Sequence, residues 1–98
     1  MSYEHNYLRH NLEVQIQHLI YDKYPVAEKK QTYYESDAWV EMREFILEIK
    51  GEVCERCSKH TRLVHHKKGL FNSLDPYEDF EVLCSSCHNK HHIIIEKQ

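Results

Sequence analysis

The first apolar pattern along the chain lies in residues 5–22 and has the spacing of an amphipathic helix. Its apolar residues return every three or four positions, and polar residues fill most of the other positions. The members of this apolar stripe are Leu8, Leu12, Ile16 and Leu19 with Ile20. Such a stripe can pack on the chain's own core or form a homodimer interface. Because a core this small needs cover, we expect packing within one chain and a monomer.

A second helix is predicted after a connector that spans residues 22–32. The connector contains Pro25 and then a charged, polar run. Ser36 or Asp37 can cap the start of the helix, and Gly51 stands where a helix C-terminus is expected. The apolar face of this helix comprises Trp39, Met42, Phe45, Ile46 and Ile49.

Beyond Gly51 the helical period disappears and shorter patterns follow. Residues 62–65 have the character of a short strand, and residues 78–83 alternate as a second strand would. Residues 85–97 are predicted to form a last helix, whose Ile93–Ile95 run packs inward. The pattern therefore predicts a small α+β domain, in which two helices precede a strand–loop–strand unit and a final helix.

Length and composition limit the class of protein. The 98 residues suffice for one domain, and no run approaches the roughly 20 apolar residues of a membrane helix. The first residues lack the basic and apolar regions of a secretory signal. We therefore expect no membrane association and a cytoplasmic location, in a bacterial or phage-encoded protein. The four cysteines should then stay reduced.

The charge is uneven along the chain. The formal net charge is −3, which argues against a protein that binds DNA tightly through many phosphate contacts. Residues 50–98, however, carry eight Lys and Arg against seven Asp and Glu. Their cations form either a local patch for a short stretch of DNA or an ordinary solvated surface. The members of this candidate patch are Arg56, Lys59, Arg62, Lys67, Lys68 and Lys90.

Two cysteine pairs have the spacing of a metal site. Cys54 and Cys57 form one Cys-x2-Cys motif, and Cys84 and Cys87 form another. Two such pairs close a tetrahedral four-thiolate site, which suits structural zinc. Disulfides or a redox pair are the remaining interpretations. A zinc ion with four protein ligands has no open position, so we expect it to stabilise the fold and not to catalyse.

Five histidines flank this zinc scaffold. His65 and His66 close the first predicted strand, and His88, His91 and His92 follow the second cysteine pair. On a helix, His88 and His92 share a face, which allows two imidazoles to bind one ion. The alternative is a zinc-binding unit with incidental exposed histidines.

Residues 33–92 resemble the HNH endonucleases, a family of ββα-metal nucleases. The matching runs are Leu63-Val64-His65-His66, Asp79-Phe80 at thirteen residues beyond His66, Val82-Leu83-Cys84-Ser85-Ser86-Cys87-His88, and His92. The upstream Tyr33-Tyr34-x-Ser36-x2-Trp39-x3-Arg43 is similar to what precedes the motif in many members. Residues 1–32, an N-terminal helix and connector, lie outside the resemblance, so residues 33–98 are the predicted nuclease domain within one compact unit.

The resemblance implies a role for each signature residue. His66 would be the general base that activates water, and Asp79, at the position of the family's Asn, would orient it. His65 and His88, with His92 as a further candidate, would hold a catalytic divalent ion. Gly69 and Asp75 depart from the residues that many relatives carry, which affects expected loop contacts to DNA.

The implied activity is metal-dependent hydrolysis of double-stranded DNA. The cofactors would be structural Zn²⁺ and catalytic Mg²⁺ or Mn²⁺, or another transition metal. One such site cuts one strand, so we expect a monomer to nick. The competing hypothesis is a non-catalytic zinc-binding module that binds DNA or protein.

The adjacent histidines pose a geometric question. Neighbouring residues on a regular strand point to opposite faces. His65 and His66 can therefore reach one site only if the chain leaves the strand at this point.

Overall fold

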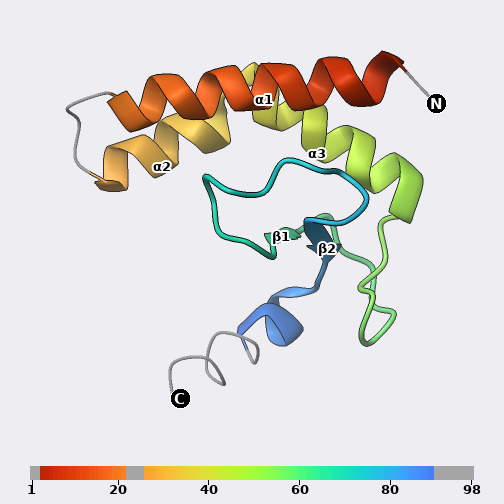
Figure 1. The fold of residues 1–98 in the computed structure, drawn as a ribbon. Helices are drawn as coiled ribbons and strands as arrows, with labels where there is room; N and C mark the ends of the chain where they lie inside the picture. The colour runs from red at the N-terminus through yellow and green to blue at the C-terminus, as the bar shows by residue number, and fades with distance from the viewer. Residues whose placement is uncertain (1–2, 22–25, 90–98) are drawn as a thin grey trace.

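The computed structural model describes residues 3–21 and 26–89, and the side chains of residues 3–5, 26 and 27 are left out of the description. Three helices precede a two-stranded antiparallel sheet, and residues 85–89 form a short final helical segment. Figure 1 shows the helices above the sheet. The elements are α1 (Tyr3–Tyr21), α2 (Val26–Glu35), α3 (Asp37–Lys50), β1 (Val64–His66) and β2 (Phe80–Val82).

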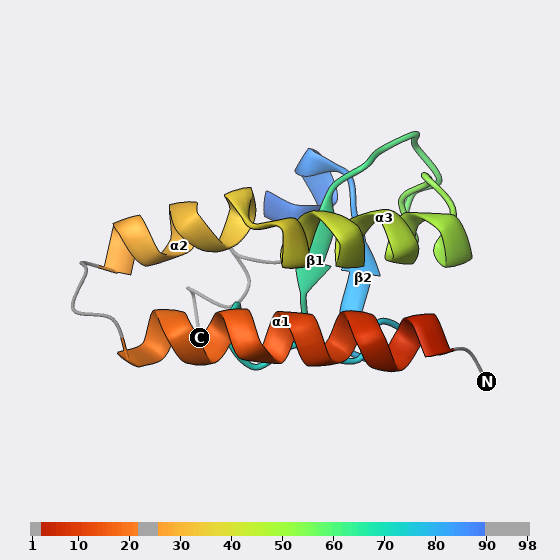
Figure 2. The same ribbon diagram turned by 90° about the horizontal axis from the view of Figure 1, so that it is seen from above.

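The first helix covers the other two. Seen from above, α2 and α3 lie end to end and run antiparallel to α1 (Figure 2). The predicted apolar stripe of α1 is buried within the chain: Leu8, Leu12, Ile16 and Leu19 all belong to the main core. Ile20, at the edge of this stripe, is about half exposed at 53%. The segment before residue 33 thus shares one core with the rest.

The predicted connector contains a helix that the sequence analysis missed. Residues 26–35 form α2, so three helices precede the sheet where two were expected. Most residues of α2 are good helix formers, and the helix begins directly after Pro25, where proline interrupts no helical hydrogen bond. The sequence of this helix is mostly polar, and among its described side chains (28–35) only Tyr33 is buried in the core. It therefore lacks the apolar stripe by which a helix is recognised in a sequence.

The predicted boundaries of α3 are confirmed. Ser36 is the N-cap, with extended backbone at ψ 146°, and its Oγ accepts a hydrogen bond from the Trp39 amide at 3.2 Å. The same Oγ donates to the Tyr33 carbonyl at 2.6 Å, which closes the corner between α2 and α3. Gly51 follows the last turn at φ +86°, a left-handed conformation in which a side chain would be strained.

The two strands are shorter than predicted but pair in register. Val64 faces Val82, His65 faces Glu81 and His66 faces Phe80. The ladder continues beyond both ends, because the Lys67 amide donates to the Asp79 carbonyl and the Leu83 amide to the Leu63 carbonyl. Alternation along the strands turns Val64, His66, Phe80 and Val82 toward one face. This face packs beneath the helices, and Phe80 and Val82 are fully buried.

The predicted final helix is described only in its first turn. Residues 85–89 are helical, whereas residues 90–98, with His91, His92 and the Ile93–Ile95 run, lie outside the described residues. Within the part of the chain that is described, none of the helices has the combination of length and apolar character that crossing a membrane requires.

The Ser36 corner generates the first prediction. Ser36→Ala removes both the N-cap acceptor and the bond to the Tyr33 carbonyl, so the free energy of unfolding should fall by about 1–2 kcal/mol. Thermal or urea unfolding measures this change. Thr32→Ala, on the exposed face of α2, is the control and should be neutral or slightly stabilising. Equal stability of the Ser36→Ala variant and the wild type would show that the cap contributes nothing.

Candidate metal centre and adjoining histidine cavity

The four cysteines meet at one point. Each offers its Sγ, and the four sulfur atoms all lie within 4.8 Å of one another. The sulfur atoms of Cys57 and Cys84 are 3.4 Å apart. The sulfurs come from two segments 27 residues apart in sequence. All four cysteines are free of disulfides, and the cluster has the size and donor set of a tetrahedral zinc site.

The first cysteine pair lies on a tight turn. The Cys54 amide donates to the Lys59 carbonyl at 2.7 Å, and the Ser58 amide donates back to the Cys54 carbonyl at 2.9 Å. Ser58 has a φ of +68°, the left-handed conformation that lets the chain reverse here. An isolated bridge between Val53 and His60 closes the turn. Local hydrogen bonds therefore turn the first two thiols to the same side.

The second pair follows β2 and is attached to the first by backbone contacts. The Glu55 amide donates to the Val82 carbonyl at 2.8 Å, and the carboxylate of Glu55 accepts from the Val82 amide. The His88 amide donates to the Cys84 carbonyl at 2.9 Å as residues 85–89 turn into a helix. Strand β2 thus joins the two cysteine pairs directly.

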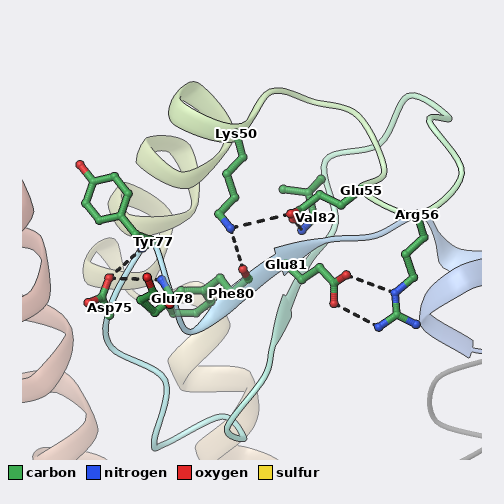
Figure 3. Close-up of polar contacts among 9 residues, drawn as sticks. All are labelled: Lys50, Glu55, Arg56, Asp75, Tyr77, Glu78, Phe80, Glu81 and Val82. Carbon is green, nitrogen blue, oxygen red and sulfur yellow. Dashed lines mark hydrogen bonds and ion pairs between the residues drawn. The ribbon is translucent and has the colours of Figure 1, made fainter.

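Charged side chains fix the first turn against α3 and β2 (Figure 3). Lys50 donates to the Phe80 carbonyl at 3.0 Å and lies 3.9 Å from the Glu55 carboxylate. Arg56 forms two hydrogen bonds with Glu81, of 3.1 and 3.3 Å. These contacts set the position of the cysteine turn relative to the sheet.

The surroundings of the sulfurs favour the thiolate form at two positions. The amide of Cys87 and the side chain of Cys57 donate toward Cys84 and lower its pKa. Burial opposes the ionisation of Cys54, but hydrogen bonds from neighbouring amides outweigh it and lower the pKa of Cys54 to about 6. The side-chain hydrogen bond with Cys84 and burial instead raise the pKa of Cys87 to about 12. A metal ion binds thiolates, so the donors at Cys54 and Cys84 suit a metal site. The residues present therefore fit structural zinc.

Beside the cluster lies a cavity of about 390 Å³ that contains three of the predicted histidines. His65 and His66 come from β1, and His88 comes from the turn after the second cysteine pair. The other walls come from β1 and the residue before it, from the following loop, and from α2. They are Leu63, Val64, Gly69, Leu70, Lys30 and Tyr34.

The two adjacent histidines point in different directions, as strand geometry requires. The His66 ring packs among the aromatic side chains of the core, 4.5 Å from Trp39 and 5.0 Å from Phe80 between ring centroids. The His65 ring instead contacts the His88 ring, with centroids 5.1 Å apart. Both histidines nevertheless line the cavity. The chain therefore does not have to leave the strand at His65 and His66 for both residues to border one site, contrary to expectation.

The Tyr33 hydroxyl is hydrogen-bonded to the Nε2 atom of His66. The Tyr33 hydroxyl lies 2.9 Å from this atom, and Tyr33 is fully buried. Burial, with smaller contributions from His65 and His88, lowers the pKa of His66 to about 4. Burial raises the pKa of Tyr33, so the hydroxyl keeps its proton. At neutral pH this places an uncharged imidazole against an uncharged phenol.

The described residues supply two of the three predicted ligands of a catalytic ion. His65 and His88 are in contact, whereas His92 lies outside the described residues. Among residues 3–21 and 26–89, the four cysteines are the one group of three or more potential ligands close enough to share an ion. The catalytic ion stays a prediction.

Asp79 is buried and closes the loop between the strands. Its Oδ2 accepts from the amides of Leu74 and Asp75, each at 3.0 Å, and its Oδ1 lies 3.0 Å from the Lys68 ammonium. Burial opposes ionisation, but these donors outweigh it and lower the pKa of Asp79. The contacts of Asp79 lie within the loop, whereas the His66 ring is hydrogen-bonded to the Tyr33 hydroxyl. The orientation of His66 by Asp79 stays a prediction.

Half of the candidate basic patch is engaged in ion pairs. Arg56 pairs with Glu81 and Lys68 with Asp79. Arg62 bridges Glu44 and Glu52. Lys90 lies outside the described residues. This pairing favours the interpretation of a solvated surface for these arginines and for Lys68.

The sequence analysis missed the contribution of α2. Tyr33 contacts His66, while Lys30 and Tyr34 line the cavity, and all three come from the segment read as a connector or from its border. The available indication was a pair of tyrosines in an otherwise charged run.

Comparisons with protein-family models, with curated proteins and with solved structures found no match to this chain. The fold and the site by themselves define a small α+β domain with a four-cysteine cluster of metal-binding size. The further resemblance to HNH endonucleases rests on the residues quoted above.

Cys54→Ser tests the metal centre. Because the binding free energy of a structural zinc ion is largely folding free energy, the variant should lose zinc and its cooperative unfolding transition. Metal analysis and circular dichroism measure both losses. Ser86→Ala, at an exposed position between the second pair of cysteines, is the control and should keep both. A soluble Cys54→Ser protein with an unchanged thermal midpoint would refute the site.

A pair of substitutions at Asp79 tests its role in the loop. Asp79→Asn keeps an oxygen that can accept from the two loop amides, whereas Asp79→Ala leaves both without an acceptor. The Ala variant should lose about 2–6 kcal/mol of unfolding free energy, from about 1–3 kcal/mol for each of the two unsatisfied amides, and the Asn variant much less. Urea unfolding separates the two. Equal stability of the variants would remove Asp79 from this role.

Proposed function

We propose that this protein is a metal-dependent endonuclease of the HNH type that hydrolyses DNA phosphodiester bonds. One observation carries the proposal: three histidines of the quoted motif, His65, His66 and His88, line a single cavity beside the four-cysteine cluster. Two of them lie more than twenty residues from the third in sequence. Their convergence supports a shared site more strongly than the motif alone.

In this proposal the histidines have two roles, general base and metal ligand. His66 takes a proton from water as the water oxygen bonds to phosphorus in line with the leaving 3′ oxygen. The bond from phosphorus to that oxygen breaks, which leaves a 5′-phosphate and, after protonation, a 3′-hydroxyl. His65 and His88, with His92, would hold a divalent ion such as Mg²⁺ or Mn²⁺. When bound, this ion supplies charge stabilisation at the phosphate and the leaving oxygen.

The contact with Tyr33 determines which atom of His66 can do this. Nε2 lies within hydrogen-bond distance of the buried hydroxyl, so in this proposal Nδ1 is the nitrogen that acts on water. The Tyr33 oxygen can accept a hydrogen bond from Nε2–H, and that tautomer leaves Nδ1 free to take a proton. Asp79 would support the same ring indirectly, by closing the loop that follows β1.

A non-catalytic zinc-binding module is the second candidate function. It is favoured by the observation that, among the described residues, the four-cysteine group is the one cluster large enough to hold an ion. Such a closed site would stabilise a surface for DNA or protein without chemistry. Metal stoichiometry separates the candidates, because the module needs one ion per chain and the nuclease needs a second, weaker site.

Partner, assembly and location follow from the proposed activity. The substrate would be double-stranded DNA, and a monomer with one site would nick it. The burial of the α1 stripe within the chain supports a monomer. A cytoplasmic location and a bacterial or phage origin stay predictions.

Cleavage of supercoiled plasmid tests the proposal. With added Mg²⁺ or Mn²⁺ the wild type should convert it to open circle before linear product appears. His66→Ala should lower the rate by about 100-fold or more, because it removes the general base, and should keep the zinc content. His60→Ala is the matched control: this histidine precedes β1 and is exposed, so the rate should not change.

Three results would contradict the proposal. One is a wild-type protein that leaves the plasmid intact with every divalent ion tested. Another is a folded His66→Ala variant that keeps more than about a tenth of the rate. The third is early linear product without an open-circle precursor from a protein of dimer mass, which would overturn nicking by a monomer.

A further inference from the structure

Helix α2 presents three different faces. Tyr33 is buried, and Lys29, one turn earlier on the same face, is half-buried. Lys30 and Tyr34, also four residues apart, line the histidine cavity. The remaining face is polar and acidic and points away from this cavity; it comprises Glu28, Gln31, Thr32 and Glu35.

The cavity face combines a cation with an aromatic surface. Lys30 is exposed, and Tyr34 is 50% exposed. The Tyr34 ring is held by edge contacts, with its centroid 6.1 Å from that of His66 and 6.2 Å from that of Trp39. A ring fixed in this way loses little rotational freedom when it binds a ligand. The exposed part of the ring therefore forms a fixed apolar surface at the cavity.

The charges around α2 decide where a polyanion can lie. Glu28 and Glu35 on the outer face would repel phosphates, whereas Lys30 on the cavity face would attract them. Three of the other cations near the sheet, Arg56, Arg62 and Lys68, contribute less because they already pair with carboxylates. A nucleic-acid strand is thus favoured on the cavity side of α2.

We propose that α2 binds the DNA strand at the histidine cavity, with Lys30 contacting a backbone phosphate and Tyr34 contacting the adjoining sugar and base. The inference rests on the proposed function for its ligand, because the phosphodiester bond to be cut would lie at the histidines. Lysine binds phosphate as a point charge, and an aromatic ring packs on a nucleotide without reading its sequence. The contact accordingly confers affinity and not sequence specificity.

Binding of a fluorescein-labelled 20-base-pair duplex, followed by anisotropy without added divalent ions, tests this contact. Lys30→Gln should raise Kd roughly three- to tenfold. It should also reduce the slope of log K against log salt concentration by about 0.9, the value for one lost phosphate contact. Lys29→Gln is the matched control, since it removes the same charge one residue away and off the cavity face. It should change neither quantity.

A second pair of variants tests the aromatic contact. Tyr34→Leu should raise Kd about fivefold or more, from the loss of aromatic packing on a nucleotide. Tyr77→Leu is its control, because Tyr77 has the same exposure of 50% but does not line this cavity. Amide shifts of the wild type on addition of the unlabelled duplex should concentrate in residues 30–34 and 65–70. This mapping does not depend on any variant being folded.

The outcomes separate this inference from the proposed nuclease. If Lys30→Gln and Lys29→Gln raise Kd equally, the effect comes from overall charge and the contact is overturned. A Tyr34→Leu variant with the Kd of the wild type would also overturn it. Amide shifts confined to other surfaces, or no binding at all, would do the same. If the wild type cleaves plasmid but Lys30→Gln and Tyr34→Leu bind the duplex as the wild type does, the α2 contact is refuted and the nuclease is not. Variant-sensitive binding without cleavage supports the contact and refutes the nuclease.

Discussion

The convergence of four cysteine sulfurs is the interaction on which the second half of the structure depends. Between Gly51 and residue 89 the chain has two three-residue strands, four turns and one short helical segment, too little regular structure to fix a site. The cluster joins the turn before β1 to the turn after β2, and the Glu55–Val82 backbone contact reinforces that link. The position of His88 relative to His65 follows directly, since His88 immediately succeeds the last cysteine.

A second constraint couples the helices to the cavity. His66 is part of the core as well as of the cavity wall, because Trp39, Phe80 and Tyr33 surround its ring. The corner at Ser36 places Tyr33 and Trp39 side by side, with stacked rings 5.5 Å apart. The orientation of the central histidine is therefore determined by the junction of α2 and α3 as much as by the sheet.

Electrostatics in this protein act locally. The net charge of −3 predicts poor general affinity for a polyanion, and several cations near the sheet are neutralised by carboxylates. One face of helix α2, beside the cavity, stays favourable for a phosphate, while another face of the same helix is acidic. An arrangement of this kind suits transient contact with a short stretch of backbone better than tight binding along a duplex.

The sequence alone determined the parts governed by local rules. Helical spacing identified α1, a capping serine and a glycine bounded α3, and the two Cys-x2-Cys motifs predicted the metal cluster, because each depends on residues close together in the chain. Tertiary structure decided the rest. Helix α2 is polar, so its sequence resembles a connector. What stabilises it is the burial of Tyr33, which depends on the rest of the fold. The contact between Tyr33 and His66 spans 33 residues, and the loop-closing bonds of Asp79 depend on backbone groups that carry no sequence signature. Contacts of these kinds follow from how the helices pack on the sheet, which no local pattern encodes.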